Sequence, residues 1–264
     1  MADDRKTVVL TGAAGGIGQA AVRRLASNGW NVLAVDRDTD RLAAIAGLPH
    51  VAIFAADVTS EDDNARMIAL AEERFGGVDA LVINAAITGG GGFEAIPFAR
   101  FRQIIEVNLF GAVMGIRAAL PALRRSVNGP AIVVTSSTMG LGGESENWAY
   151  GASKHALIGI VHSLSREIGW EGIRINALCP GPTRDTGMTR IVESGAPEHF
   201  AMLARNVPLQ RWADADEMAA VMEFLISPAA SYVNGHAMVA DGGTINGTGL
   251  AAPASGQGRV MPDH

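Results

Sequence analysis

The sequence predicts a single-domain α/β protein: a doubly wound, mostly parallel, seven-stranded sheet with helices on both faces, as in dinucleotide-binding folds. Three observations support this. Short apolar runs alternate with stretches of helical periodicity along most of the chain. The runs are apolar throughout, which is typical of strands covered on both faces. The helical stretches between them imply right-handed parallel crossovers.

The first half of the chain supplies four of the strands. The expected strands are residues 7–12 (TVVLTG), 31–36 (NVLAVD), 50–58 (HVAIFAADV) and 78–86 (VDALVINAA). Residues 16–28, between the first two, repeat small and aliphatic side chains at helical spacing. Residues 61–75 form a second helix, because Ser60 can cap it and the acidic residues that follow suit the helix dipole.

The second half supplies three strands and two long helices. Helices are expected at about 97–126 and 148–169, and strands at 131–137 (AIVVTSS), 172–181 (GIRINALCPG) and 236–243 (HAMVADGG). The domain should cover residues 1–248, followed by a Gly- and Ala-rich tail over 249–264. Residues 183–206 interrupt the strand order and are expected to form a substrate lid, with Gly187 and Gly195 as hinges.

Composition disfavours several classes of function. The chain has 264 residues and a net charge of −6, without the clustered cations that nucleic acid binding needs. Its six histidines show no ligand spacing and there is no CxxC, so no metal site is predicted. The single cysteine, Cys179, fits a reducing compartment and a buried position. The acidic N-terminus and the lack of an apolar run near the roughly 20 residues that span a bilayer predict a cytoplasmic protein without a membrane partner.

Glycines follow the first strand where a helix begins. In TGAAGGIG, Gly12 permits a tight turn, Gly16 lets the backbone approach a pyrophosphate, and Gly18 allows close packing of helix on strand. The helix N-terminus, with Ile17 in its first turn, offers N–H groups and a partial positive charge to phosphates. The spacing is GxxxGxG without GK[ST], which disfavours a P-loop. A purely structural role for these glycines is the alternative.

The second strand ends at Asp36, where a carboxylate can accept hydrogen bonds from ribose hydroxyls. The same charge would repel a 2′-phosphate, so NAD is favoured over NADP. Arg37 is the complication, because a turned guanidinium could recruit NADP. The alternative for Asp36 is a solvated turn carboxylate.

Two further strand ends carry candidate cofactor contacts. Asp57 and Val58 follow the third strand and could flank the adenine, although Asp57 could equally cap the next helix. Asn84 follows the fourth strand, where a dinucleotide crosses the top of the sheet.

The stretch WAYGASKHAL places Tyr150 and Lys154 four residues apart, so both project from one side of a helix. A phenol has a reference pKa of about 10 and is a poor base near neutrality. An adjacent ammonium, and a positive nicotinamide ring, would lower that pKa towards the range useful for proton exchange with an alcohol. Ser137, at the end of the fifth strand, could hold the substrate oxygen beside the phenol. The alternative is a half-buried helix with a satisfied phenol and a snorkelling lysine.

These features resemble the short-chain dehydrogenase/reductase family, of the single-domain type. The matching stretches occur in family order: TGAAGGIG (11–18), NAA (84–86), VNL (107–109), SS (136–137), YGASK (150–154), PG (180–181) and DGG (241–243). The resemblance implies that Tyr150 is the acid/base and that Ser137 polarises the carbonyl or orients the alcohol. It implies that Lys154 binds the nicotinamide ribose and lowers the tyrosine pKa, and that Asn108 holds a water leading protons to Lys154.

The resemblance also implies cofactor contacts from Pro180 and Gly181, followed by a threonine near the nicotinamide amide. Asp185 occupies the expected position of that threonine, and we expect Thr183 to replace it through its backbone. Ala86 stands where the family commonly has glycine, which predicts a local change in backbone or cofactor geometry. A homo-oligomer, with a tetramer favoured, is implied as well.

The preferred function is NAD-dependent interconversion of a secondary alcohol and a ketone. Polar residues of the segment 140–147 favour a polyol, sugar or cyclic alcohol, whereas Met139, Leu141 and Met188 would suit an apolar substrate. One alternative is an NADPH-dependent ketoreductase of acyl-carrier substrates, which Asp36 and the negative net charge disfavour. The other is a catalytically silent dinucleotide sensor.

Overall fold

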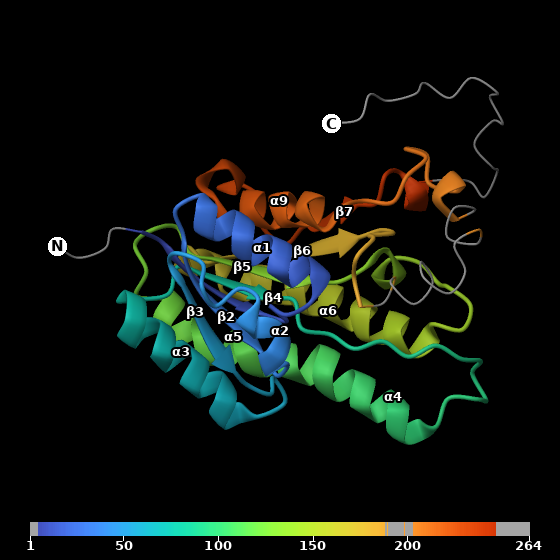
Figure 1. Cartoon of the computed structure of the whole chain (residues 1–264), viewed down its shortest axis with the longest axis horizontal. Coiled ribbons are helices and arrows are strands. Elements are labelled where there is room, and N and C mark those ends of the chain that lie inside the picture. The colour runs from blue at the N-terminus through green and yellow to red at the C-terminus, as the bar shows by residue number, and fades with distance from the viewer. Residues whose placement is uncertain (1–4, 188, 190–197, 199–202, 247–264) are drawn as a thin grey trace.

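The computed structural model describes residues 5–187, 189, 198 and 203–246. Seven parallel strands form one sheet in the order β3-β2-β1-β4-β5-β6-β7 (Figure 1). They are β1 (Thr7–Thr11), β2 (Asn31–Asp36), β3 (Val51–Ala55), β4 (Ala80–Ile83), β5 (Ala131–Thr135), β6 (Arg174–Pro180) and β7 (Ala237–Ala240). The predicted fold class is confirmed, and every observed strand lies within its predicted range.

Helices cover both faces of the sheet, as the uniformly apolar strands predict. One core cluster joins the sheet to α3 (Glu61–Phe75), α5 (Gly111–Leu123) and α6 (Trp148–Glu167). The other joins it to α1 (Gly16–Ser27), α2 (Thr39–Ala43) and α9 (Ala215–Ile226). Figure 1 shows α1 and α9 side by side above the sheet, with α3 and α5 below it. The central strands β1, β4 and β5 are buried along their whole length.

Several helical elements depart from the prediction. The expected helix over 97–126 is α4 (Phe98–Ile105), a π-helical segment η1 (Glu106–Phe110) and α5 in succession. Neither α2 nor α9 was predicted, although Asp38 caps α2 and Asp214 with Glu217 forms a capping box on α9. Short 3-10 turns complete the fold: η2 (Thr138–Gly140), η3 (Gly169–Glu171), η4 (Pro228–Ala230) and η5 (Thr244–Asn246).

The stretch Phe98–Leu123 corrects one expectation from the sequence. It has 26 residues and a mean hydropathy of 1.4, enough by length and composition to cross a membrane, and it is the one such helix among the residues described. Ile104, Ala112 and Ile116 of this stretch are buried inside the protein. Packing inside the fold therefore accounts for much of its apolar character.

Parts of two predicted segments lie outside the described residues. These parts are positions 188, 190–197 and 199–202 of the lid, with its hinge Gly195, and the whole tail 249–264. The first part of the lid is held by a parallel bridge between Thr183 and Ala213. The segment after it packs on the end of β7, where the amide of Leu209 donates to the carbonyl of Gly242.

Candidate active site

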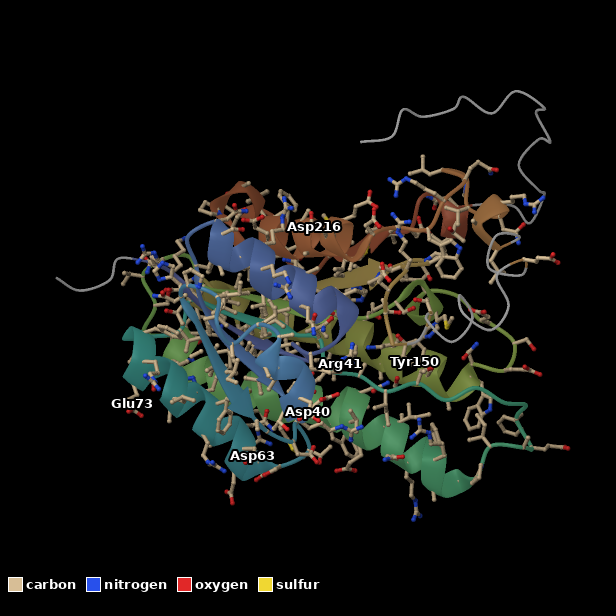
Figure 2. All side chains as sticks on the ribbon, in the orientation of Figure 1. Asp40, Arg41, Asp63, Glu73, Tyr150 and Asp216 are labelled. Carbon is tan, nitrogen blue, oxygen red and sulfur yellow. The ribbon has the colours of Figure 1, made fainter. Side chains whose placement is uncertain are left out.

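The predicted site residues gather at the carboxyl edge of the sheet. Because all strands run parallel, the ends of β1, β2, β4, β5 and β6 lie along the same edge. Tyr150 reaches this edge from α6, as Figure 2 shows, whereas the labelled acidic side chains Asp63, Glu73 and Asp216 come from α3 and α9 on the outside of the fold.

The side chains of Ser137 and Tyr150 lie next to each other. The Ser137 hydroxyl lowers the pKa of the Tyr150 phenol, and the two residues are 9% and 7% exposed. Ser137 follows β5 and also caps η2, where its Oγ accepts from the amide of Met139 at 3.1 Å. These contacts leave the serine hydroxyl next to the phenol.

Lys154 lies beneath the tyrosine ring and is only 2% exposed. Its Nζ donates to the carbonyl of Thr135 at 2.8 Å and sits 5.4 Å from the centroid of the Tyr150 ring. Burial lowers the pKa of Lys154 to about 7, partly offset by the Cys179 side chain. The alternative of a snorkelling lysine is therefore wrong.

The expectation of a lowered tyrosine pKa is corrected. Burial raises the pKa of Tyr150 to about 12, although the hydrogen bond with Ser137 lowers it. The physical reason is desolvation: the phenolate loses its hydration in this buried position, and that loss outweighs the stabilisation available from its neighbours. Lys154 is itself desolvated, and its hydrogen bond goes to a strand carbonyl.

Asn108 lies in the π-helical segment η1 and is 1% exposed. Its Oδ1 accepts from the amide of Ile87 at 2.8 Å, and its Nδ2 donates to the carbonyl of Ile87 at 2.9 Å and to the Ser153 Oγ at 3.0 Å. Both N–H donors and one acceptor position of the side-chain amide therefore tie η1 to Ile87 and to α6.

Cys179 is buried, as predicted. It is fully enclosed on β6 behind Ser136 and Ser137, and it belongs to the core cluster on the α6 face of the sheet. Burial raises the pKa of its thiol, with smaller opposing effects from Ser136, Ser137 and Lys154. A protonated, enclosed thiol is a poor nucleophile.

The glycine loop is closely packed. Gly12 adopts φ +69°, and a Cβ there would lie 2.6 Å from the amide nitrogen of Ala85. A Cβ on Gly18 would lie 2.1 Å from the carbonyl oxygen of Gly12, which confirms the predicted need for close packing at this position. Gly16 faces the carbonyl oxygen of Asp185, 2.2 Å from where a Cβ would be. The neighbour that requires glycine at position 16 is thus a backbone carbonyl of the segment after β6.

The N-terminus of α1 suits an anion. Its N-cap is Gly15, and its first turn, which contains Ile17, has no acidic residue. In contrast, α3 is capped by Ser60 and begins with three acidic residues. The positive end of α1 is therefore uncompensated by its own side chains, which fits the pyrophosphate of a dinucleotide.

Asp36 ends β2 directly beside this loop. Its Oδ2 accepts from the amide of Ala14 at 2.9 Å and its Oδ1 from the amide of Asp38 at 3.1 Å. A carboxylate has about four acceptor positions, so two lone pairs remain for ribose hydroxyls. Asp36 thus joins the glycine loop and is not a freely solvated turn residue.

The adenine-side candidates have mixed roles. Asp57 lies beyond the end of β3, and its carboxylate accepts from the amide and hydroxyl of Thr59, which lower its pKa together with the nearby Arg37 charge. The helix cap of α3 is Ser60, so the capping alternative for Asp57 is wrong. Val58 lies against Gly111, at the start of α5.

Asn84 locks three strand ends together. Its Nδ2 donates to the carbonyl of Gly12 at 3.1 Å, and its Oδ1 accepts from the hydroxyl of Thr135 at 3.2 Å. Its side chain therefore connects the glycine loop to the strand whose last carbonyl holds Lys154. The close approach to Gly12 comes from Ala85, and the adjacent Ala86 is half-buried.

The nicotinamide-side candidates follow β6. Pro180 is its last residue, the amide of Gly181 donates to Ala240, and a Cβ on Gly181 would lie 2.4 Å from the Asp241 Cβ. Thr183 is buried, and its hydroxyl donates to the carbonyl of Gly181 at 3.1 Å. In the parallel bridge between Thr183 and Ala213, the hydrogen bonds to Ala213 are made by the neighbours Pro182 and Arg184. The backbone N–H of Thr183 therefore points away from Ala213.

Three residues that organise the site were not predicted. Thr135 supplies the carbonyl for Lys154, Ser153 connects Asn108 to α6, and Asp241 accepts from the amides of Gly243 and Ile245. Ser153 and Asp241 lie within the motifs YGASK and DGG, so the motifs themselves were the available signal. Thr135 carries no such signal, because its contact is made by a backbone atom.

Comparison with known proteins agrees with this geometry. A family model described as enoyl-(acyl carrier protein) reductase matches residues 12–244. An uncharacterized short-chain type dehydrogenase/reductase of Sinorhizobium fredii is 38% identical over 91% of this chain, which spans only 45% of that protein. The 2,5-dichloro-2,5-cyclohexadiene-1,4-diol dehydrogenase of Sphingobium indicum is 32% identical over 90% of this chain and 96% of that protein. A solved variant of actinorhodin polyketide ketoreductase with NADPH gives a TM-score of 0.87 at 31% identity, over 93% of this chain and all of that chain.

Proposed function

The chain belongs to the short-chain dehydrogenase/reductase family, and we propose that it is an NAD-dependent enzyme interconverting a secondary alcohol and a ketone. The observation that carries the proposal is that the hydroxyls of Ser137 and Tyr150 lie next to each other, with the buried Lys154 5.4 Å from the centroid of the Tyr150 ring. This group lies at the sheet edge that also carries the uncapped end of α1. An acid/base, an orienting hydroxyl and an anion site thus share one edge.

Tyr150 exchanges the proton in this proposal. During alcohol oxidation its phenolate accepts the hydroxyl proton as the C–H bond breaks and the carbonyl forms, and the reverse reaction returns that proton. Ser137 holds the substrate oxygen beside the phenol. NAD, when bound, supplies the acceptor for the hydride and an additional positive charge. Burial favours the protonated phenol, so the resting enzyme is prepared to act as an acid, and oxidation requires deprotonation first.

Lys154 and Asn108 support that proton exchange. Lys154 is held at Thr135 with its charge beside the ring, and a ribose hydroxyl is its proposed second partner. The resemblance gives Asn108 a water that leads protons to Lys154. Because the Asn108 side chain is bonded to Ile87 and Ser153, this role falls to its backbone carbonyl.

NAD is favoured by Asp36. Its carboxylate sits against the glycine loop and would repel a 2′-phosphate. Arg37 is exposed, and its charge acts on Asp57. We further assign Gly12, Gly16, Ile17, Gly18, Asp57, Val58, Asn84, Pro180, Gly181 and Thr183 to the cofactor site.

The proposed substrate is a polyol, sugar or cyclic secondary alcohol. The cyclic class is supported by the relative named as a cyclohexadiene-diol dehydrogenase. The segment before α6 forms one side of the site, and the carbonyl of Glu146 accepts from the amide of Gly91 in the loop after β4 at 2.8 Å. Glu144 in the same segment is exposed.

We also propose a cytoplasmic homotetramer that binds neither nucleic acid nor membrane. The net charge of −6 supports the first exclusion. Exposed Phe98 and Phe110 on the long helix support self-association, because large exposed apolar side chains on one element mark contact surfaces.

The alternative is an NADPH-dependent ketoreductase, which the solved relative with NADPH favours. The test is to measure reduction of NAD and of NADP with a panel of cyclic, sugar and acyclic secondary alcohols, and the reverse reaction with the matching ketones. NAD-linked oxidation of a secondary alcohol supports the proposal. Exclusive use of NADP(H) supports the ketoreductase, and binding without turnover supports a dinucleotide sensor.

A further inference from the structure

Ser153 is a polar residue of the YGASK motif that the proposed chemistry does not use, and it is completely buried. Its Oγ donates to the carbonyl of Tyr150 at 2.7 Å and accepts from the Nδ2 of Asn108 at 3.0 Å. One hydroxyl therefore touches the backbone of the tyrosine and the side chain of the asparagine. A serine has one donor and two acceptor positions, so this geometry uses its donor and one acceptor.

Asn108 extends this contact beyond α6. Its remaining polar atoms form two hydrogen bonds with the backbone of Ile87, at 2.8 and 2.9 Å. Ile87 lies in the loop after β4, and the amide of Gly91 in the same loop donates to the carbonyl of Glu146 in the segment before α6. A continuous chain of buried hydrogen bonds thus runs from the Tyr150 turn of α6, through η1, to the loop after β4.

We propose that Ser153 is a positioning residue of the active site: its hydroxyl fixes the Tyr150 turn of α6 against Asn108. It acts through Asn108, and it contacts neither substrate nor cofactor. The expected loss of kcat rests on the proposed function. The expected change in hydrogen bonding at Asn108 does not, because it can be measured without turnover.

Removal of the hydroxyl has a specific physical effect. Ser153→Ala leaves one N–H of a buried Asn108 without a partner, and such a group is costly to leave unpaired. The side chain can recover a partner only by turning, which breaks its bonds to Ile87. Serine bonding to the preceding turn also bends helices, so α6 would straighten locally at Tyr150.

The test compares Ser153→Ala with Ser163→Ala in the full-length protein. Ser163 lies on the same helix and makes a similar bond, to the carbonyl of Gly159 at 3.0 Å, but it is exposed. The first readout is hydrogen exchange at the Ile87 amide, which should become about tenfold faster in Ser153→Ala and stay unchanged in Ser163→Ala. This readout needs no turnover. The second readout is kcat with the best alcohol, which should fall about tenfold or more, with the KM for the dinucleotide unchanged.

Two further variants keep the test decisive. Ser153→Cys retains a weak donor and acceptor, and should recover part of the loss of kcat if alanine folds poorly. The kcat of the double variant Asn108→Ala/Ser153→Ala should be no lower than that of Asn108→Ala alone. Unchanged exchange at Ile87, or kcat losses that multiply in the double variant, would overturn the inference. A wild-type enzyme that oxidises no alcohol would contradict the proposed function and leave the exchange result valid.

Discussion

The Nζ of Lys154 lies 5.4 Å from the centroid of the Tyr150 ring, while its hydrogen bond goes to the carbonyl of Thr135. Lys154 therefore lies beside the tyrosine ring in a position fixed by the end of a strand. Both groups are buried, and burial works against the charged form of each, raising the pKa of Tyr150 and lowering that of Lys154. Burial thus shifts each group toward its neutral form in the protein without a bound dinucleotide.

This burial predicts a pH dependence of stability. The pKa of Lys154 is 10.5 unfolded and about 7 folded, so between these values the unfolded state binds more protons. Stability therefore rises with pH through this window, and below pH 7 the full cost of burying the ammonium remains. Lys154→Met removes that cost. Urea unfolding measures the free energy of unfolding of wild type and of Lys154→Met. The value for wild type minus that for Lys154→Met should increase by about 2–3 kcal/mol between pH 6.5 and 9.5.

The control is Lys6→Met, a substitution at the chain's other lysine, whose Nζ bonds an exposed carbonyl at Asn128. Lys6→Met should follow the pH dependence of wild type. A constant difference between wild type and Lys154→Met across this range would show that Lys154 is not held as a buried amine.

The reaction rate should depend on pH differently in the two directions. Because burial raises the pKa of Tyr150 to about 12, the phenolate needed for alcohol oxidation becomes more abundant as pH rises. Log kcat/KM for oxidation should rise across pH 7–10, whereas ketone reduction, which uses the protonated phenol, should stay nearly constant over this range. Initial rates in constant-ionic-strength buffers check this. Oxidation that is flat from pH 6 to 10 would argue against proton transfer to Tyr150 in the limiting step.

Asp36 should control the choice of dinucleotide. Asp36→Asn removes the charge that repels a 2′-phosphate and keeps an oxygen to accept from the Ala14 amide. The ratio of kcat/KM for NAD to that for NADP should fall about tenfold or more, since a like charge removed from a contact is worth at least that much. Arg37→Ala is the matched control at the neighbouring exposed position, and it should leave an NAD preference intact. An unchanged ratio in Asp36→Asn would remove Asp36 from the cofactor site.

Gly18 should tolerate no side chain. A Cβ there would lie 2.1 Å from the carbonyl oxygen of Gly12, and the neighbour is backbone that cannot turn aside. Gly18→Ala should destabilise the protein by about 2–4 kcal/mol or prevent folding. Gly159→Ala, in exposed helix with no atom within 4 Å of its Cβ position, should instead stabilise it by about 0.5–1 kcal/mol. Thermal unfolding of both variants measures the contrast, and equal effects would contradict the packing described for the loop.

The strands were predictable from their apolar runs, which are fully buried in β1, β4 and β5, and the positions of Ser137, Tyr150 and Lys154 followed from motif spacing. The π-helical segment at Asn108 was not predictable, because it preserves the apolar pattern of a regular helix. The contact between Lys154 and Thr135 is made by a backbone carbonyl and leaves no mark on residue type. The prediction of a lowered Tyr150 pKa was wrong for another reason. Residue spacing reveals a neighbouring charge, but it does not reveal how deeply the phenol is buried.

The most direct test of the proposed chemistry is turnover by Tyr150→Phe. This variant keeps the ring beside Lys154 and removes only the hydroxyl that bonds Ser137. NAD binding, measured by calorimetry, should stay within about threefold of wild type, while kcat for alcohol oxidation should fall about 10²–10⁴-fold. Turnover within tenfold of wild type, with binding intact, would contradict the assignment of Tyr150 as the proton acceptor.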